Sequence, residues 1–467
     1  MPSSIGHSAG RSQLNSCPEK EDAGDSCQQI HRQRVMCTCN TYIVSLLCQL
    51  LCPSFTSFMV SSRLFLVLLT TTTALVTPPP GRRAVLRDAA ALTLAPLVLP
   101  CEAQAQAQAD VQFATSWKAT DGFSDASFIS FDEGAYAAMR DDEGRTPLFE
   151  KAIKSRLYGQ EGKLTVLEIG TGPFALLALI AARAGARKVY AIEAQPEAAR
   201  RARQVVREAG FENIIEVLDG FSTAVSLPEK ADLVVAEIVG SIASEEGIYA
   251  TIRDAQSRLV KRPDLASSWI PSRVQTLAAP ATYALHYALG PPSFDWGKLK
   301  EPVRLNCRDE TLQTLAEPLV LEDISFADMA LPAAGTSWRP SPPARSFVVS
   351  GARIEANQEK YYAELRKEGA KEKEALALSD AVAHTFSGLA MWPRLVLDDE
   401  ATLVVESRGP HGEHRKSHWQ TVLPLLSARP QPIDAGDTVV VRAAVELGSG
   451  VANPLRYTLE GEVRKVG

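Results

Sequence analysis

A run of alternating apolar strands and helices that begins at Val166 constrains the fold of this chain most strongly. Residues 164–169, 188–192 and 232–236 are short apolar segments, and helix-like segments separate them. This alternation is typical of an α/β fold with a parallel sheet, because each helix carries the chain back across the sheet. Ligands of such sheets bind at the carboxyl ends of the strands. Functional residues are therefore expected directly after these strands.

An acidic loop, residues 237–246, directly follows the apolar segment 232–236 and carries Glu237 and Glu246. Two carboxylates that lie close together and are shielded from water are costly unless a cation neutralises them. A guanidinium can do so, because it forms charge-assisted, bidentate hydrogen bonds with carboxylates. The loop thus favours a guanidinium site, and the alternative is a solvated loop without a ligand.

A glycine-containing turn, Gly170-Thr-Gly172, joins the first strand to a helix expected at residues 173–184. Glycines let the backbone approach a ligand closely, and the start of the helix offers free N–H groups. Glu193 ends the second strand about 20 residues further on, where an acidic residue typically contacts ribose hydroxyls. These features predict a nucleotide-cofactor site, but they do not separate a dinucleotide from another adenosine cofactor.

Three segments, 166–172, 184–193 and 237–246, together resemble the protein arginine methyltransferases, which methylate arginine side chains with S-adenosylmethionine. Residues 269–273 and 417–421 add to the resemblance, which covers roughly residues 128–466. It implies an α/β, Rossmann-like S-adenosylmethionine-dependent methyltransferase domain followed by an antiparallel β-barrel domain. It also implies that Glu237 and Glu246, nine positions apart, form a double-glutamate loop in which Glu245 has no catalytic part.

The resemblance assigns roles to single residues. Arg145 would pair with the carboxylate of the cofactor, and Asp142 would meet His418 across the active site. The implied catalytic residues are Glu237, Glu246, His418 and Asp142; the implied cofactor-binding residues are Arg145, Glu168, Gly170, Gly172, Glu193, Thr223 and Met139; and the implied substrate-binding residues are Glu237, Glu246 and Trp419. No metal is expected. Without the resemblance, each of the side chains outside the two loops would be read as a surface charge or a packing residue.

Several positions depart from the pattern of the family. Tyr136 stands where histidine is usual, Phe174 where a third glycine is frequent, and Thr223 where an acid commonly contacts the adenine amino group. Residues 238–239, Ile-Val, replace the familiar Trp-Met, so the substrate tunnel should have different walls. Both loop glutamates and the cofactor strand are unchanged by these departures.

Composition limits the remaining functions. The net charge of −6 argues against direct nucleic-acid binding and is compatible with a cationic protein substrate. Six of the eight cysteines lie in the first 52 residues, so the folded body should contain neither a disulfide framework nor a cysteine-based metal cluster.

The first 110 residues do not have the pattern of the rest of the chain. Residues 61–70 resemble a signal-peptide core, and a second apolar run at 89–100 follows a twin arginine at 82–83. This order resembles a bipartite transit peptide for a plastid, with a lumenal destination suggested by the twin arginine and a cytoplasmic location as the alternative. A membrane anchor or a true start at Met59 is also open. Neither run reaches the 18 or so uninterrupted apolar residues of a membrane span, so none is expected in the mature protein.

These patterns divide the chain into residues 1–110, a targeting extension; 111–271, the cofactor-binding domain with N-terminal helices; and 272–467, a β-barrel domain with a helical insertion at about 354–384. Short apolar stretches separated by Pro and Gly predict the antiparallel part. A Lys/Glu-rich helix is expected at 358–378, with a solvated face. The family forms homodimers through an arm, for which residues 289–314 are the candidate.

The sequence thus predicts methyl transfer from S-adenosylmethionine to the guanidinium nitrogens of arginine residues in proteins. One alternative is a methyltransferase for another protein or a small molecule, because this cofactor fold serves many substrates. The other is a binding relative without catalysis, which Thr223, Tyr136 and Ile238 suggest.

Overall fold

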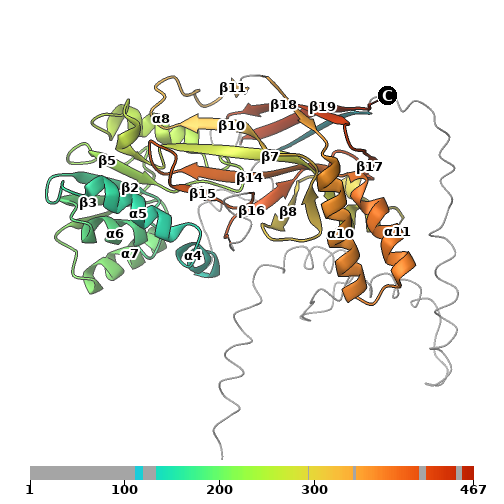
Figure 1. The fold of residues 1–467 in the computed structure, drawn as a ribbon. Coiled ribbons are helices and arrows are strands. Elements are labelled where there is room, and N and C mark those ends of the chain that lie inside the picture. The colour runs from blue at the N-terminus through green and yellow to red at the C-terminus, as the bar shows by residue number, and fades with distance from the viewer. Residues whose placement is uncertain are drawn as a thin grey trace, which may run out of the picture. The chain divides into compact units, whose positions relative to one another are not determined.

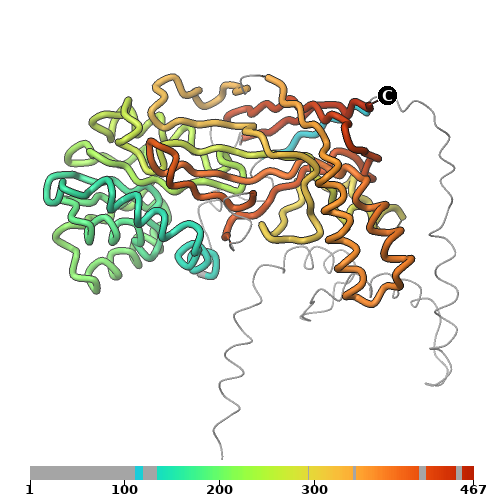
Figure 2. The backbone as a smooth tube through the Cα atoms, viewed as in Figure 1, coloured from blue at the N-terminus to red at the C-terminus, as the bar shows by residue number. Residues whose placement is uncertain are grey.

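The computed structural model describes residues 111–118, 133–292, 294–339, 343–409, 417–448 and 455–466, and these all belong to one compact unit of the chain. They form a parallel sheet with helices and a set of antiparallel sheets (Figures 1 and 2). The predicted targeting extension, residues 1–110, lies outside the described residues.

The parallel sheet has five strands in the order β4-β3-β2-β5-β6. Its strands are β2 (Thr165–Ile169), β3 (Lys188–Glu193), β4 (Ile215–Asp219), β5 (Leu233–Ala236) and β6 (Trp269–Ile270). Every residue of β2 and β5 is buried, as expected of central strands that are covered on both faces. The strand order reverses between β2 and β5, which is where sheets of this kind bind their ligands. The loops after these two strands carry the predicted cofactor and guanidinium residues.

Helices cover this sheet (Figure 1). They are α4 (Glu133–Arg140), α5 (Thr146–Leu157), α6 (Leu176–Arg183), α7 (Pro196–Glu208) and α8 (Ile248–Arg258), and a 3₁₀ turn, η2 (Ala266–Ser268), precedes β6. The helix expected from residue 173 begins later, because Ala175 adopts a left-handed backbone with φ 44°. Residues 173–175 therefore form a turn, which places the first α-helical N–H groups of α6 deeper beside the sheet.

Antiparallel strands form the rest of the fold. The larger sheet has the order β10 (Leu319–Ser325), β7 (Arg273–Tyr283), β14 (Gly388–Val396), β16 (Gln420–Leu423) and β8 (Val303–Asn306), with β15 (Val404–Glu406) beside β14 and β9 (Leu312–Thr314) beside β7. The second has the order β1 (Val111–Lys118), β19 (Arg456–Arg464), β18 (Thr438–Glu446) and β11 (Ser337–Trp338), with β12 (Ala344–Val348) beside β18. A short pair, β13 (Thr385–Phe386) and β17 (Gln431–Pro432), completes them. A parallel Rossmann-like sheet followed by antiparallel sheets confirms the predicted fold class.

The first described strand, β1, pairs with the last one, β19. The sequence grouped residues 111–118 with the cofactor-binding part, yet β1 pairs along its whole length with β19, from Val111 opposite Val463 to Lys118 opposite Arg456. Phe113 and Trp117 are its buried side chains, and the Trp117 ring stacks on Tyr457 of β19. The domain bounds remain a prediction.

The expected Lys/Glu-rich helix is two helices, α10 (Gly351–Lys367) and α11 (Glu372–Ala383). The chain turns between them at Gly369, whose φ of 93° favours glycine. The inner face of α10 packs on β9, where the Asn357 side-chain amide donates to the carbonyl of Thr314 over 3.1 Å. Residues 289–314, the candidate arm, lie after α9 (Ala284–Ala288) and supply η3 (Trp296–Lys298), β8 and β9. Among the described residues, no helix has the length and apolar character that a membrane crossing requires.

Candidate active site

The turn after β2 has a backbone conformation that favours glycine at two positions. Gly170 and Gly172 have φ angles of 80° and 62°, in the left-handed region that favours glycine. A side chain at Gly170 would place its Cβ 3.0 Å from Cγ2 of Ile238. The Gly172 N–H donates to Oε2 of Glu193 over 2.8 Å, and the other oxygen of Glu193 accepts from Gln195 N over 2.9 Å. The predicted cofactor residues Gly170, Gly172 and Glu193 thus lie together at the ends of β2 and β3.

Glu168 supports this turn from below. Its Oε2 accepts from the Thr171 hydroxyl over 2.5 Å and from Ala178 N of α6 over 3.0 Å. Burial raises the pKa of Glu168 to about 7, although both hydrogen bonds favour the charged form. Glu168, which was expected to bind the cofactor, therefore ties the turn to α6.

Arg145 lies between the glycine turn and the acidic loop. Its Nε donates to Oε2 of Glu237 over 2.9 Å, its Nη2 donates to the same oxygen, and only 7% and 6% of the two side chains are exposed. Its Nη1 donates to the carbonyl of Met139 over 3.3 Å. The sequence assigned Arg145 to the cofactor and Glu237 to the substrate. It gave no signal for their pairing, because 92 positions separate them.

The two loop glutamates share a poorly hydrated region after β5. The pKa of Glu246 is raised to about 8, first by burial and then by the charges of Glu237 and Glu245, against the opposing charge of Arg304. Glu245 is committed elsewhere, since its Oε1 accepts from Arg304 Nη2 over 2.5 Å and its Oε2 from Ile242 N over 3.1 Å. Glu237 is thus held by Arg145 and Glu246 lies beside it as a further carboxylate, while Glu245 braces the loop.

This raised pKa has a consequence for stability. An acid whose folded pKa lies above its unfolded value of about 4.3 keeps its proton only in the folded state, so stability falls as pH rises between the two values. We expect Glu246→Gln, which cannot ionise, to gain stability over the parent protein from about pH 5 to pH 8, by at most about 1.4 kcal/mol per pH unit. Urea unfolding of both proteins across this range measures the difference. A difference that does not change with pH would contradict the raised pKa.

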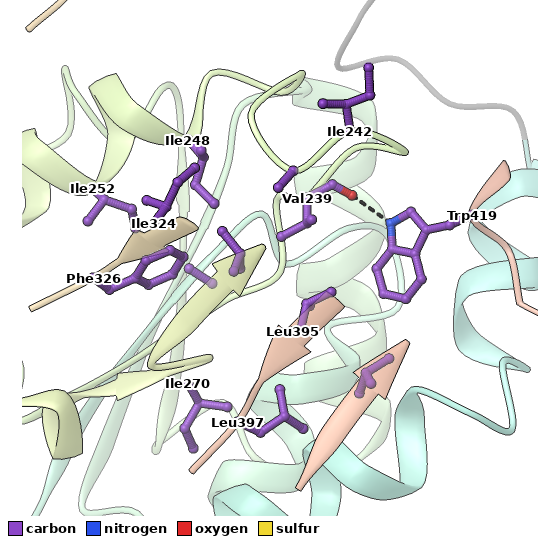
Figure 3. Packing of buried hydrophobic residues seen from close by; sticks show 14 of the residues in the cluster. Val239, Ile242, Ile248, Ile252, Ile270, Ile324, Phe326, Leu395, Leu397 and Trp419 are labelled. Carbon is purple, nitrogen blue, oxygen red and sulfur yellow. Dashed lines mark hydrogen bonds between the residues drawn. The ribbon is translucent and has the colours of Figure 1, made fainter. Parts of the chain in front are cut away.

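Antiparallel strands hold the backbone of the acidic loop. Trp419 donates its indole N–H to the carbonyl of Val239 over 2.6 Å (Figure 3). Gln420 N donates to the Ser241 hydroxyl over 3.1 Å, just beyond it. Trp419 was expected to bind substrate, but its ring is 4% exposed and its one donor is used on the loop. We infer that Trp419 positions the loop.

We expect Trp419→Phe to lower turnover at least fivefold, because it leaves the Val239 carbonyl without this donor. Such a loss costs about 1–3 kcal/mol when the partner is buried. Trp296 supplies a matched control: its indole N–H donates to the carbonyl of Leu289 over the same 2.6 Å, outside the loop. Trp296→Phe should lower the melting temperature similarly and leave turnover unchanged. Equal effects of both variants on turnover would rule out a specific role of Trp419.

Asp142 and His418 meet as the sequence predicted. His418 Nδ1 lies 2.8 Å from Oδ2 of Asp142, which also accepts from the backbone N of His418 over 3.0 Å. The other oxygen of Asp142 accepts from the N–H groups of Gly144 and Arg145. Burial alone would raise the pKa of Asp142, but the hydrogen bonds from His418 and the backbone hold it below its usual range. The pair ties the turn between α4 and α5 to the start of β16.

The remaining predicted site residues, Thr223 and Met139, are less buried. Thr223 is exposed in the segment after β4. Met139 is half-buried on α4, the helix whose Tyr136 ring lies 3.4 Å from where a Cβ of Gly172 would stand. Sequence reasoning missed Thr276 and Tyr457, which contact the acidic loop from β7 and β19. No local pattern in the sequence could have found them, since their partners are 33 and 213 positions away.

Comparisons with known proteins agree with this geometry. Residues 146–264 match the family described as ribosomal protein L11 methyltransferase (PrmA). Protein arginine N-methyltransferase PRMT10 of Arabidopsis thaliana is 36% identical over 137 residues, which are 28% of this chain and 35% of that protein, so the chain matches about a third of its length. Arginine N(omega)-methyltransferase of Streptomyces achromogenes subsp. streptozoticus is 28% identical over 323 residues, 66% of this chain and 74% of that protein.

Solved structures are similar over a larger share of the chain. The protein arginine methyltransferase 10 structure of Arabidopsis thaliana has a TM-score of 0.49 and 18% identity, and the similarity covers 72% of this chain and 99% of that one. The Trypanosoma brucei PRMT1 enzyme-prozyme complex with AdoHcy has the same TM-score, with 17% identity over 71% and 99% of the chains. The sequence matches, the glycine turn and the double-glutamate loop agree with one another: over the matched residues the chain is similar to protein arginine N-methyltransferases.

Proposed function

We propose that this protein transfers methyl groups from S-adenosylmethionine to the guanidinium nitrogens of arginine residues in proteins. The observation that carries the proposal is the acidic loop, in which Glu237 already binds a guanidinium, that of Arg145. Glu246 adds a second carboxylate whose pKa is raised by desolvation and by its acidic neighbours, and the charged form of such a group is stabilised by a bound cation. Relatives named as arginine methyltransferases support the same activity.

The residues around the glycine turn fit S-adenosylmethionine. Gly170 is exposed, so solvent reaches its backbone, and a Cβ there would lie only 3.0 Å from Cγ2 of Ile238. Glu193 places a carboxylate at the end of β3 beside the turn, within reach of ribose hydroxyls. Arg145, whose charge acts on Glu168 below the turn, would hold the carboxylate of the cofactor. When bound, S-adenosylmethionine supplies a methyl group activated by a sulfonium.

The protein contributes orientation and a place for the proton. Hydrogen bonds to Glu237 and Glu246 would fix the guanidinium so that one nitrogen points at the methyl carbon, and fixing both partners supplies much of the acceleration. The nitrogen forms its bond to carbon as the carbon–sulfur electron pair returns to sulfur. The nitrogen then loses a proton, so the product keeps one positive charge. Glu246 is the proposed acceptor: a bound guanidinium would favour its charged form, and the carboxylate could then take the proton that the nitrogen releases.

A second candidate substrate is arginine itself. The relative that aligns with 66% of this chain is named as an arginine methyltransferase rather than a protein arginine methyltransferase. The same pair of carboxylates would bind the guanidinium of either substrate.

Labelled methyl transfer by the full chain separates these candidates. The substrates are Arg-rich peptides, matched peptides with Lys for Arg, and free arginine. Label on the Arg peptides alone supports the proposal, and label on free arginine alone moves the assignment to the small molecule. Binding of S-adenosylmethionine without transfer to any of them would overturn both.

We also propose a homodimer, on the family resemblance, and a plastid-targeting role for residues 1–110. Light scattering tests the first proposal. Imaging of the chain with and without residues 1–110 tests the second.

A further inference from the structure

A buried carboxylate lies behind the double-glutamate loop. Glu322 of β10 is 3% exposed and belongs to neither the glycine turn nor the acidic loop. Burying a carboxylate is costly unless hydrogen bonds compensate for the lost water. Its contacts therefore indicate what it does.

A β-bulge directs Glu322 inward. In the pairing of β10 with β7, Val320 lies opposite Leu277 and Glu322 lies opposite Thr276, so Leu321 is an extra residue on β10. A bulge of this kind changes the side-chain alternation and turns a side chain to the other face. Leu321 and Glu322 are consequently both buried. The bulge brings the Glu322 carboxylate to Thr276.

Thr276 connects Glu322 to the loop before Glu246. The Thr276 hydroxyl donates to Oε2 of Glu322 over 2.8 Å and accepts from Ala243 N over 3.0 Å. A hydroxyl has one proton, so donation to Glu322 fixes its lone pairs toward Ala243. The next residue, Ser244, pairs its hydroxyl with that of Tyr457 over 2.6 Å.

Glu322 also faces the chain after Glu246. Tyr249 lies in the first turn of α8 and is 4% exposed. Burial raises the pKa of its hydroxyl, and the charge of Glu322 raises it further. Glu322 is thus tied by hydrogen bonds through Thr276 to the segment before Glu246, and its charge acts on the segment after Glu246.

We propose that Glu322 and Thr276 are positioning residues that fix the double-glutamate loop so that the Glu246 carboxylate is held facing Glu237. This proposal rests on the proposed function, because it assigns these residues to the same guanidinium site. It predicts that removal of the hydroxyl or of the carboxylate acceptor loosens the loop, while conservative replacements that keep the hydrogen bonds do not.

Two pairs of variants in the full chain test it. Thr276→Val removes the hydroxyl and Thr276→Ser keeps it; Glu322→Leu removes the acceptor and Glu322→Gln keeps an oxygen that accepts. We expect turnover at saturating cofactor to fall at least tenfold in Thr276→Val and Glu322→Leu and to stay within threefold in Thr276→Ser and Glu322→Gln. The dissociation constant for S-adenosylmethionine should change less than threefold in all four.

Hydrogen exchange at the amides of residues 242–247 gives a readout that needs no methyl transfer. We expect the Ala243 amide to exchange at least tenfold faster in Thr276→Val than in Thr276→Ser. If the parent protein methylates nothing but this difference is seen, the positioning proposal stands and the proposed function fails. Turnover and exchange that are unchanged in Thr276→Val, with only a lower melting temperature, would overturn the positioning role. Should Thr276→Val and Glu322→Leu not fold, Glu322→Gln decides, since a tenfold loss of turnover at normal stability would contradict the acceptor role.

Discussion

Replacing Glu246 with Gln is expected to lower methyl transfer about a hundredfold or more while making the folded protein more stable. The loss follows from the chemistry, because a neutral amide neither balances the charge of a guanidinium nor accepts the proton released from the nitrogen. The gain follows from the electrostatics, since Glu246 is half-buried and its charged form is destabilised by desolvation and by the charges of Glu237 and Glu245. At pH 7 we expect a gain of about 1–3 kcal/mol in the free energy of unfolding.

The neighbouring residue provides a matched control. Glu245→Gln changes the same atoms one position earlier, but Glu245 is paired with Arg304 and with the backbone of Ile242. We expect this variant to lose stability and to keep most of its turnover, the opposite of Glu246→Gln. Chemical unfolding, steady-state methyl transfer and titration with S-adenosylmethionine measure the three quantities. Near-normal turnover in Glu246→Gln would refute the assigned role, and a weaker cofactor affinity would move Glu246 from the substrate to the cofactor.

Local patterns in the sequence were sufficient to predict the parallel part of the fold. The segment 188–192 plus Glu193 is strand β3, and the glycines and Glu193 meet as their spacing predicted. These features depend on apolar runs, turn residues and distances along the chain, which a single sequence displays. The Asp142–His418 contact was also anticipated, through the family resemblance rather than through any pattern.

What the sequence could not show is how the antiparallel strands support the site. Ser244 and Tyr457 are 213 positions apart, and Trp419 reaches Val239 across 180. Such contacts are decided by tertiary packing, and propensity or periodicity carries no information on them. For the same reason, the sequence did not reveal that β1 belongs to the antiparallel part. Its residues, among them Phe113 and Trp117, form a strand because they pair with β19. The acidic loop was therefore recognised from its residues, and its rigidity only from the structure.

Replacing Arg145 with Met is expected to have the largest effect on stability. Arg145 is the cation that Glu237 contacts through two nitrogens, and both side chains are almost fully buried. Removing one partner of a buried ion pair leaves an uncompensated charge and costs about 3–5 kcal/mol. Turnover should be lost as well, because Glu237 would lose its orientation and the cofactor its proposed carboxylate partner.

A double-mutant cycle separates the ion pair from other effects of Arg145. In Arg145→Met with Glu237→Gln, no charge remains unpaired, so the double variant should be more stable than Arg145→Met alone and still inactive. Arg262, which pairs with Asp264 on the exposed surface, gives the control: Arg262→Met should leave unfolding by urea and turnover unchanged. Strictly additive effects of the two substitutions would show that the contact between Arg145 and Glu237 contributes no coupling. If the double variant recovers stability but not activity, the pair has two functions. The fold then requires only that neither charge is left unpaired, whereas methyl transfer requires both charged side chains.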